Sequence, residues 1–254
     1  LVRAVLAKVK RRLNGSSGNV ESLFRDAAVT PAALEYAHFP NLRAIRTFSA
    51  PSSERRVTMV TDSVGRSSLF GGVGTAVLLG AHLANRLDAQ FRVVTRTERS
   101  SPSNIDQVLS AYGVSLRREP QFHLAHIDNP AAAVDVGDNE LFLTTSWWTT
   151  EALLKGVSPS SIVYLLQEDE RMFYAFGDER LRCEALLSRR DLRFVVNSRL
   201  LLDHLVSSGL PHMQDQAIAF EPAFPANVFH RRPRNERAAR KRFFFYARPH
   251  NARN

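Results

Sequence analysis

Short apolar runs alternate with amphipathic segments of about ten residues between residues 54 and 222, and this alternation limits the fold more than any other feature of the sequence. We predict buried strands at residues 56–61, 91–95, 122–127, 141–145, 162–166, 193–196 and 216–220. We predict helices at residues 75–87, 104–112 (with Ser103 as N-cap), 150–155, 179–188 and 200–207 (with Gly209 as C-cap). Such alternation is typical of parallel strands joined by crossover helices. Residues 54–222 are therefore predicted to form a Rossmann-like α/β domain with a doubly wound, mostly parallel sheet.

The two ends of the chain lack this alternation. In residues 1–13 (LVRAVLAKVKRRL) apolar side chains recur at helical spacing until a polar, glycine-containing break, so residues 1–53 are predicted to be a helical arm. Residues 223–241 are rich in arginine and proline without periodicity, which is typical of a linker. The apolar run RFFFYA then indicates that residues 242–254 begin a truncated C-terminal domain. We therefore expect the chain to be part of a longer protein.

The formal net charge of +9 at first suggests a nucleic-acid partner. The charge is concentrated at the ends, however. Residues 231–254 hold nine bases and one acid, residues 1–13 hold five bases and no acid, and the chain between them carries 20 bases against 24 acids. Because the basic linker offers neither a reading helix nor an aromatic RNA-binding motif, we expect no nucleic-acid partner.

The sequence also bears on the compartment. It has no secretory signal pattern and no apolar run near the ~20 residues that a membrane span needs, which favours a cytoplasmic protein. Two interpretations of the basic helix at residues 1–13 stay open: it docks on the body of the protein, or it lies peripherally on the inner face of a membrane. Cys183 is the only cysteine, which excludes an internal disulfide and a cysteine-based zinc site.

A glycine cluster follows the first predicted strand, where an open α/β sheet presents its ligand crevice. Gly71, Gly72 and Gly74 would let the backbone approach an anion or a sugar beside the N-terminus of the next helix. The sequence GGVG contains neither GxGxxG nor a P-loop lysine, so it does not predict a dinucleotide or P-loop site. The alternative is a tight turn that only glycine can make.

An acidic and aromatic loop, QEDERMFYAFG, follows the predicted strand at residues 162–166. Carboxylates beside aromatic rings suit sugars, whose hydroxyls need hydrogen-bond acceptors and whose ring faces stack on apolar surfaces. Gln167, Glu170, Phe173 and Tyr174 are therefore candidate substrate-binding residues. The alternative is a charged loop that Phe173 and Tyr174 anchor to the core.

Two further strand ends carry candidate residues at the same sheet edge. Trp147 and Trp148 follow the predicted strand at residues 141–145, and we expect one in the core and the other as a stacking platform. Asn197 follows the strand at residues 193–196, and it either binds a ligand or caps the next helix.

Metal and nucleophile chemistry have little support in the sequence. His123 and His126 alternate within a predicted strand without a further ligand at metal spacing, so we predict no metal site. No Ser-His-Asp order with a nucleophile elbow occurs, and the catalytic residue stays unassigned.

Several of these pieces recur in one known family. The GGVG loop, the SWWT segment at residues 146–149, the loop from Gln167 to Gly177, Asn197 with the serine after it, and the closing YARPxxxRN resemble, in this order, the WsaF-like rhamnosyltransferases of glycosyltransferase family four. The resemblance covers residues 56–254. The loop of that family reads Gln-Asp-aromatic-Glu-Pro, whereas this chain has QEDER, which keeps Gln167 and Glu170.

The resemblance implies a GT-B fold of two facing Rossmann-like domains, of which residues 54–222 would be the acceptor-side domain. It implies transfer of a deoxyhexose from a nucleoside-diphosphate sugar such as dTDP-rhamnose to a polysaccharide or other glycan acceptor of the cell envelope, with retention and without a metal or other cofactor. The missing C-terminal domain would hold most of the nucleotide, with Arg248 and Arg253 on the diphosphate, and the isolated chain would be nearly inactive. A non-catalytic carbohydrate- or nucleotide-binding module of the same fold is the alternative.

Overall fold

The computed structural model describes residues 38–66, 68–69, 71–129 and 131–225. The chain divides into two compact units between Arg43 and Ala44. The 3-10 turn η1 (Pro40–Leu42) belongs to the first unit, and everything described below belongs to the second.

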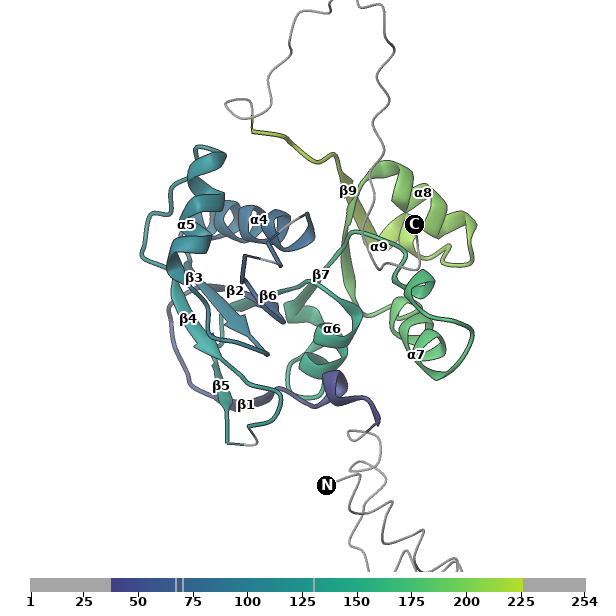
Figure 1. Cartoon of the computed structure of the whole chain (residues 1–254), viewed down its shortest axis with the longest axis horizontal. Coiled ribbons are helices and arrows are strands. Elements are labelled where there is room, and N and C mark those ends of the chain that lie inside the picture. The colour runs from purple at the N-terminus through teal and green to yellow at the C-terminus, as the bar shows by residue number, and fades with distance from the viewer. Residues whose placement is uncertain (1–37, 67, 70, 130, 226–254) are drawn as a thin grey trace, which may run out of the picture. The chain divides into compact units, whose positions relative to one another are not determined.

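A seven-stranded sheet with the order β4-β3-β2-β6-β7-β8-β9 forms the centre of the second unit (Figure 1). Its strands are β2 (Arg56–Thr61), β3 (Gln90–Thr95), β4 (Gln121–Leu124), β6 (Glu140–Thr144), β7 (Ile162–Leu166), β8 (Arg193–Asn197) and β9 (Ala217–Phe220). Every neighbouring pair is parallel. Each of the seven predicted strands overlaps one of these, so the predicted Rossmann-like parallel sheet is confirmed.

The sheet winds outward in two directions from its centre. The connecting helices are α4 (Gly72–Leu87), α5 (Pro102–Ala111), α6 (Trp147–Leu154), α7 (Asp178–Leu187), α8 (Arg199–Ser207) and α9 (Met213–Gln216), with 3-10 turns η2 (Pro159–Ser161) and η3 (Glu170–Phe173). Because crossovers are right-handed, α4 and α5 lie on the face opposite α6 to α9 (Figure 1). The direction reverses between β2 and β6, and ligand crevices of doubly wound sheets lie at such a switch point.

Apolar side chains on the α4 side of the sheet form the main core. They come from β2, β3, α4 and α5 with single contributions from β6 and β7, and they include Val57, Met59, Val77, Ala81, Phe91, Val93, Ile105, Leu143 and Leu165. Gly80 shows how closely α4 approaches β3, because a Cβ added there would lie 2.5 Å from the ring of Phe91. Cys183 is buried in α7.

Three helix starts differ from the prediction by two or three residues. We placed the helix after the glycine cluster at residue 75, whereas α4 begins at Gly72, so the cluster forms its cap and first turn. The N-cap of α5 is Ser101 and not Ser103, because Pro102 occupies the first helical position, where its missing N–H costs nothing. The helix predicted from residue 150 begins at Trp147, because Ser146 caps α6 in a capping box with Thr149.

A second, two-stranded sheet was not predicted at all. It consists of β1 (Arg46–Ser49) and β5 (Ala133–Val136) in parallel. The prediction of a helical arm over residues 1–53 is therefore wrong for the residues of β1, while residues 1–37 lie outside the described residues. The four-residue β1 carries too little pattern to be recognised, and its partner strand is far away in sequence. Thr47 further ties β1 to the end of α6 by donating its hydroxyl to the Gly156 carbonyl (3.0 Å).

A charged cluster joins this small sheet to the large one. Asp135 of β5 pairs with Arg56 of β2 and with Arg92 of β3 (Nη1 to Oδ1, 2.6 Å). Glu140 of β6 pairs with the same two arginines, at 2.7 Å from Arg56 and 2.5 Å from Arg92. The Arg92 Nε also donates to the Thr58 hydroxyl (3.1 Å). Burial alone would raise the pKa of Asp135, but the two arginines hold that pKa below its ordinary value.

Every helix in the described part of the chain is too short or too polar to cross a membrane. Residues 1–13 and the linker at residues 223–241 lie outside the described residues, except for the linker's first three positions. The peripheral membrane contact and the basic linker therefore stay predictions.

Candidate functional site

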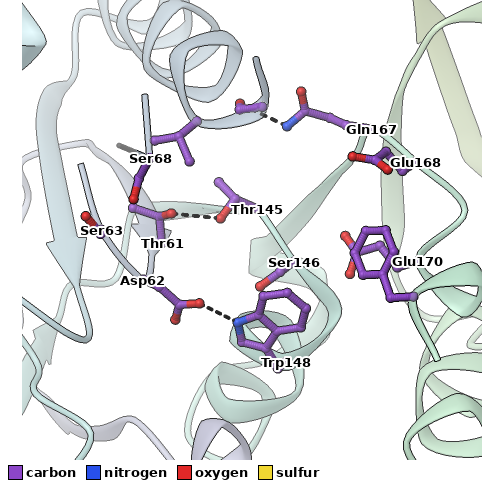
Figure 2. A pocket seen from close by; sticks show the side chains of 13 residues that line it. Thr61, Asp62, Ser63, Ser68, Thr145, Ser146, Trp148, Gln167, Glu168 and Glu170 are labelled. Atoms are coloured by element: carbon purple, nitrogen blue, oxygen red, sulfur yellow. Dashed lines mark hydrogen bonds between the residues drawn. The ribbon is translucent and has the colours of Figure 1, made fainter. Parts of the chain in front are cut away.

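A pocket of about 250 Å³ opens at the carboxyl ends of β2, β6 and β7, beside the start of α4 and the η3 turn (Figure 2). This is the switch point of the sheet. Its lining consists of Thr61, Asp62, Ser63, Ser68, Gly72, Val73, Thr145, Ser146, Trp148, Gln167, Glu168, Glu170 and Phe173.

The pocket brings together candidates from three separate segments: the start of α4, the start of α6 and the segment after β7. Gly72, Trp148, Gln167, Glu170 and Phe173 all line it. The other described candidates lie outside the lining: Gly71, Gly74, Trp147, Tyr174 and Asn197. Arg248 and Arg253 lie outside the described residues.

Gln167 closes one side of the pocket against the first turn of α4. Its side-chain Nε2 donates to the Gly72 carbonyl at 2.9 Å, so the end of β7 is tied to the glycine cluster. A Cβ at Gly72 would lie 2.7 Å from that Nε2. Gly71 has φ +70°, a backbone conformation that residues with a side chain rarely adopt. Gly74 is buried, and the Leu69 carbonyl oxygen lies 2.9 Å from where its Cβ would be, so packing explains this glycine.

Glu170 is the first residue of η3, and its side chain reaches the start of α6. Its Oε2 accepts a hydrogen bond from the backbone N–H of Trp147 at 2.9 Å, where the helix dipole favours a negative charge. The side chain is buried, and burial raises the pKa of Glu170 to about 7 despite that hydrogen bond. A carboxyl group that exchanges its proton near neutral pH therefore lines the pocket.

One tryptophan is in the core, as we expected, and the other lines the pocket, where its role as a stacking platform stays a prediction. Trp147 is buried, and its Nε1 donates to the Tyr174 hydroxyl at 2.8 Å, so both residues anchor the loop to the core. Trp148 is partly buried and lines the pocket. Its Nε1 donates to Oδ2 of Asp62 at 2.6 Å. The two indoles meet edge to face with centroids 6.2 Å apart.

Of the other two acids in the loop, one lines the pocket and the other stabilises the fold. Glu168 lines the pocket, whereas Asp169 forms a bidentate pair with Arg171, with two N–O distances of 2.8 Å. Arg171 also donates to the Ser208 carbonyl (3.1 Å), and the His204 Nε2 lies 3.2 Å from Asp169. Burial would raise the pKa of Asp169, but the pairing with Arg171 lowers it. Asp169 and Arg171 therefore stabilise the loop as each other's partners.

Sequence reasoning missed Asp62, which directly follows β2 and lines the pocket. Burial raises the pKa of Asp62, while the hydrogen bond from Trp148 and the charge of Arg96 oppose that rise. The position itself was the available signal, because Asp62 is the first acid after the strand at the switch point. The glycine cluster farther along the same loop is the more conspicuous pattern. The hydroxyl-bearing residues Thr61, Ser63, Ser68, Thr145 and Ser146 were also missed.

The lining suits a neutral polyhydroxyl ligand. Three carboxylate side chains and several hydroxyls can accept or donate hydrogen bonds, and Trp148 and Phe173 add apolar surface. None of the lining residues is a lysine or arginine, so this pocket lacks the cations that a diphosphate prefers. In the described part of the chain, no group of three or more His, Cys, Asp or Glu side chains is placed to hold a metal ion.

Asn197 ends β8 and is partly exposed. Ser198 precedes α8, and its side chain makes no capping hydrogen bond. His123 lies in β4, where burial and the charge of Arg92 lower its pKa. Neither residue lines the pocket.

Comparison with known proteins gives one family. The family described as "WsaF, N-terminal domain" matches residues 56–196, more than half of the chain. The match runs from the first residue of β2 almost to the end of β8, so it includes every residue that lines the pocket. A comparison with curated proteins gave no match. The chain therefore belongs to the family of the WsaF N-terminal domain.

Proposed function

We propose that the chain is the acceptor-side part of a glycosyltransferase that moves a deoxyhexose, first of all rhamnose, from a nucleoside-diphosphate sugar to a glycan acceptor. Membership of the WsaF family relates the chain to glycosyltransferases in general. The observation that carries the finer proposal is the pocket at the switch point, with carboxylates and hydroxyls around an indole. Its volume of about 250 Å³ is below the roughly 300–1,000 Å³ of pockets for drug-sized ligands, which suits a single sugar ring.

The charge of the pocket lining indicates which of the two substrates binds there. A donor diphosphate needs cations, and the pocket lining has none. We therefore propose that a sugar ring of the acceptor occupies this pocket. The diphosphate would bind outside it, where the family resemblance assigns Arg248 and Arg253. Stabilisation of the leaving diphosphate by such cations would be the main catalytic contribution. Retention of configuration, independence of metal ions and a cytoplasmic role in polysaccharide synthesis belong to the same proposal.

The test uses the full-length protein with a panel of dTDP-, UDP- and GDP-sugars and rhamnose-containing glycan acceptors. We expect release of nucleoside diphosphate with dTDP-rhamnose, undiminished by EDTA, and a product whose anomeric configuration by NMR matches that of the donor. Absence of turnover with every donor would overturn the enzyme proposal. Sugar binding without turnover would favour the non-catalytic carbohydrate-binding module.

A substitution at Gly72 tests the pocket without removing a polar group. The methyl group of Gly72→Ala would meet the Gln167 amide and displace it into the pocket, because a Cβ there lies 2.7 Å from Nε2. Gln167 is flexible, so we expect the free energy of unfolding to change by no more than about 1 kcal/mol. The KM for the acceptor should rise several-fold.

The matched control is Gly177→Ala. Nothing lies within 4 Å of a Cβ at Gly177, and its extended backbone accepts any residue. Thermal unfolding and steady-state kinetics of both variants separate stability from binding. An unchanged acceptor KM in Gly72→Ala would show that the pocket beside Gln167 does not receive the acceptor.

A further inference from the structure

We propose that Asp62 is a positioning residue that fixes the indole of Trp148 as the platform on which a sugar ring stacks, and so favours rings with an apolar face. This inference rests on the proposed function, since it assumes that the pocket receives a sugar. It assigns a role to the one acidic lining residue that neither the glycine cluster nor the acidic loop supplies.

The contact joins the ends of two neighbouring strands. Asp62 follows β2, Trp148 is the second residue of α6 after β6, and β2 and β6 are adjacent in the sheet. The Trp148 Nε1–H donates to Asp62 Oδ2 at 2.6 Å, which is short for a hydrogen bond from nitrogen (Figure 2). Thr145 also connects the two strand ends, because its hydroxyl donates to that of Thr61 at 3.1 Å.

Asp62 is itself held in place by the end of β3. Its backbone carbonyl accepts hydrogen bonds from the N–H groups of Arg96 and Thr97 (3.1 and 3.0 Å) and from the Thr97 hydroxyl (2.8 Å). Its second carboxylate oxygen, Oδ1, is buried and has no hydrogen-bond partner among the described residues. The other oxygen, Oδ2, accepts the indole N–H of Trp148, and the role that we assign to the carboxylate is to orient that ring.

Trp148 is constrained on a second side as well. Trp147 packs against it edge to face, and Trp147 in turn donates a hydrogen bond to Tyr174. An indole has a single hydrogen-bond donor, and Asp62 uses it. What the ring still offers a ligand is its apolar surface. Glu168 and Glu170 lie across the pocket from Asp62 and can accept hydrogen bonds from ring hydroxyls (Figure 2).

This arrangement distinguishes sugars by their apolar surface. A 6-deoxyhexose carries a methyl group where the matching hexose carries a hydroxymethyl group. A fixed indole gains contact area from the methyl group, whereas an indole that can tilt loses part of that gain. We therefore expect the Asp62 bond to increase the preference for L-rhamnose over L-mannose, two sugars that differ only in the oxygen at C6.

The experiment follows the Trp148 indole N–H directly. The chain has only two tryptophans, so the full-length protein, labelled with ¹⁵N at tryptophan, has two indole resonances from this chain, and Trp147→Phe and Trp148→Phe assign them. Methyl α-L-rhamnoside and methyl α-L-mannoside are the probes. The wild type should bind the rhamnoside more tightly than the mannoside, and binding should shift the Trp148 resonance.

The variants separate the hydrogen bond from the charge and from the ring. Trp148→Phe keeps an aromatic ring but loses the N–H, and Asp62→Ala loses the acceptor, so each should weaken rhamnoside binding roughly tenfold and raise the acceptor KM with the donor KM unchanged. Asp62→Asn keeps an acceptor oxygen and should restore most of the affinity. Asp106→Ala, an exposed aspartate of α5, is the matched control. The double variant Asp62→Ala/Trp148→Phe should bind the rhamnoside no more weakly than either single variant does.

Two results would overturn the inference: unchanged rhamnoside affinity and preference in Trp148→Phe, or additive effects in the double variant. Because Trp148→Phe changes no charged group, it keeps the test decisive if Asp62→Ala fails to fold. Turnover without any shift of the Trp148 resonance would refute this inference and leave the proposed function standing. A shift of the Trp148 resonance without turnover would support this inference and refute the proposed enzymatic function.

Discussion

Replacing Glu140 by alanine is expected to lower the free energy of unfolding by about 3–5 kcal/mol. The Glu140 side chain is 1% exposed and pairs with Arg92, which is 3% exposed, and with Arg56. Its removal leaves two guanidinium groups with Asp135 alone, away from water. The loss is costly because each buried guanidinium loses one of its two carboxylate partners and gains no hydration in its place. Chemical denaturation of the wild type and the variant measures the loss.

The control is an ion pair of similar length on the surface. Glu54 lies 2.9 Å from Arg118, and the two side chains are 46% and 39% exposed. Exposed pairs contribute about 0–1 kcal/mol, so Glu54→Ala should change stability by no more than that. If Glu140→Ala costs no more than Glu54→Ala, water reaches the Glu140 cluster and the small sheet is not held by buried charge.

Replacing Glu170 by glutamine is expected to stabilise the protein above pH 7 and to flatten the pH dependence of its stability. Burial raises the pKa of Glu170 to about 7 from an ordinary value of 4.5, so the folded state binds this proton more tightly than the unfolded state. The contribution of Glu170 to stability is therefore complete below about pH 4.5 and is lost as the pH rises to about 7. The loss amounts to roughly 3 kcal/mol. Glutamine cannot ionise, but its side-chain oxygen can still accept the Trp147 N–H.

The measurement is the difference in unfolding free energy between Glu170→Gln and the wild type from pH 4 to pH 8.5. Every other titrating group is common to both proteins, so the difference isolates Glu170. It should change in favour of the variant through the range between about 4.5 and 7 and then level off. Parallel curves over the whole range would mean that the carboxyl is ionised in the folded state with an ordinary pKa.

Most of the large sheet follows from local pattern. The strands at β2, β7 and β8 were predicted within one residue of their bounds, because buried parallel strands are short, continuous apolar runs. Helix starts were less accurate, because caps depend on single residues. Pro102 and Ser146 begin their helices earlier than apolar periodicity indicates. The strand β1 was missed because four residues carry too little pattern.

The candidate site was predicted in outline. Carboxyl ends of parallel strands meet at one edge, so the order of strands and loops suffices to place Gly72, Trp148 and Gln167 together. Their individual roles could not be predicted in this way. Which tryptophan is buried depends on Tyr174 and on the start of α6, and the inward direction of Glu170 depends on its bond to Trp147.

By itself the sequence determined the parallel sheet, the loops at the carboxyl ends of its strands and the family, since all three rest on residue order and on patterns within single segments. Only the tertiary structure decided which side chains pair. Asp62 meets Trp148 across 86 residues of chain, Arg92 meets Glu140 across 48, and β1 pairs with a strand more than 80 residues away. Such contacts follow from the packing of strands and helices against one another, and no local pattern encodes them. The same packing removes water from Glu170 and so changes its pKa, which the neighbouring residues in the sequence could not predict.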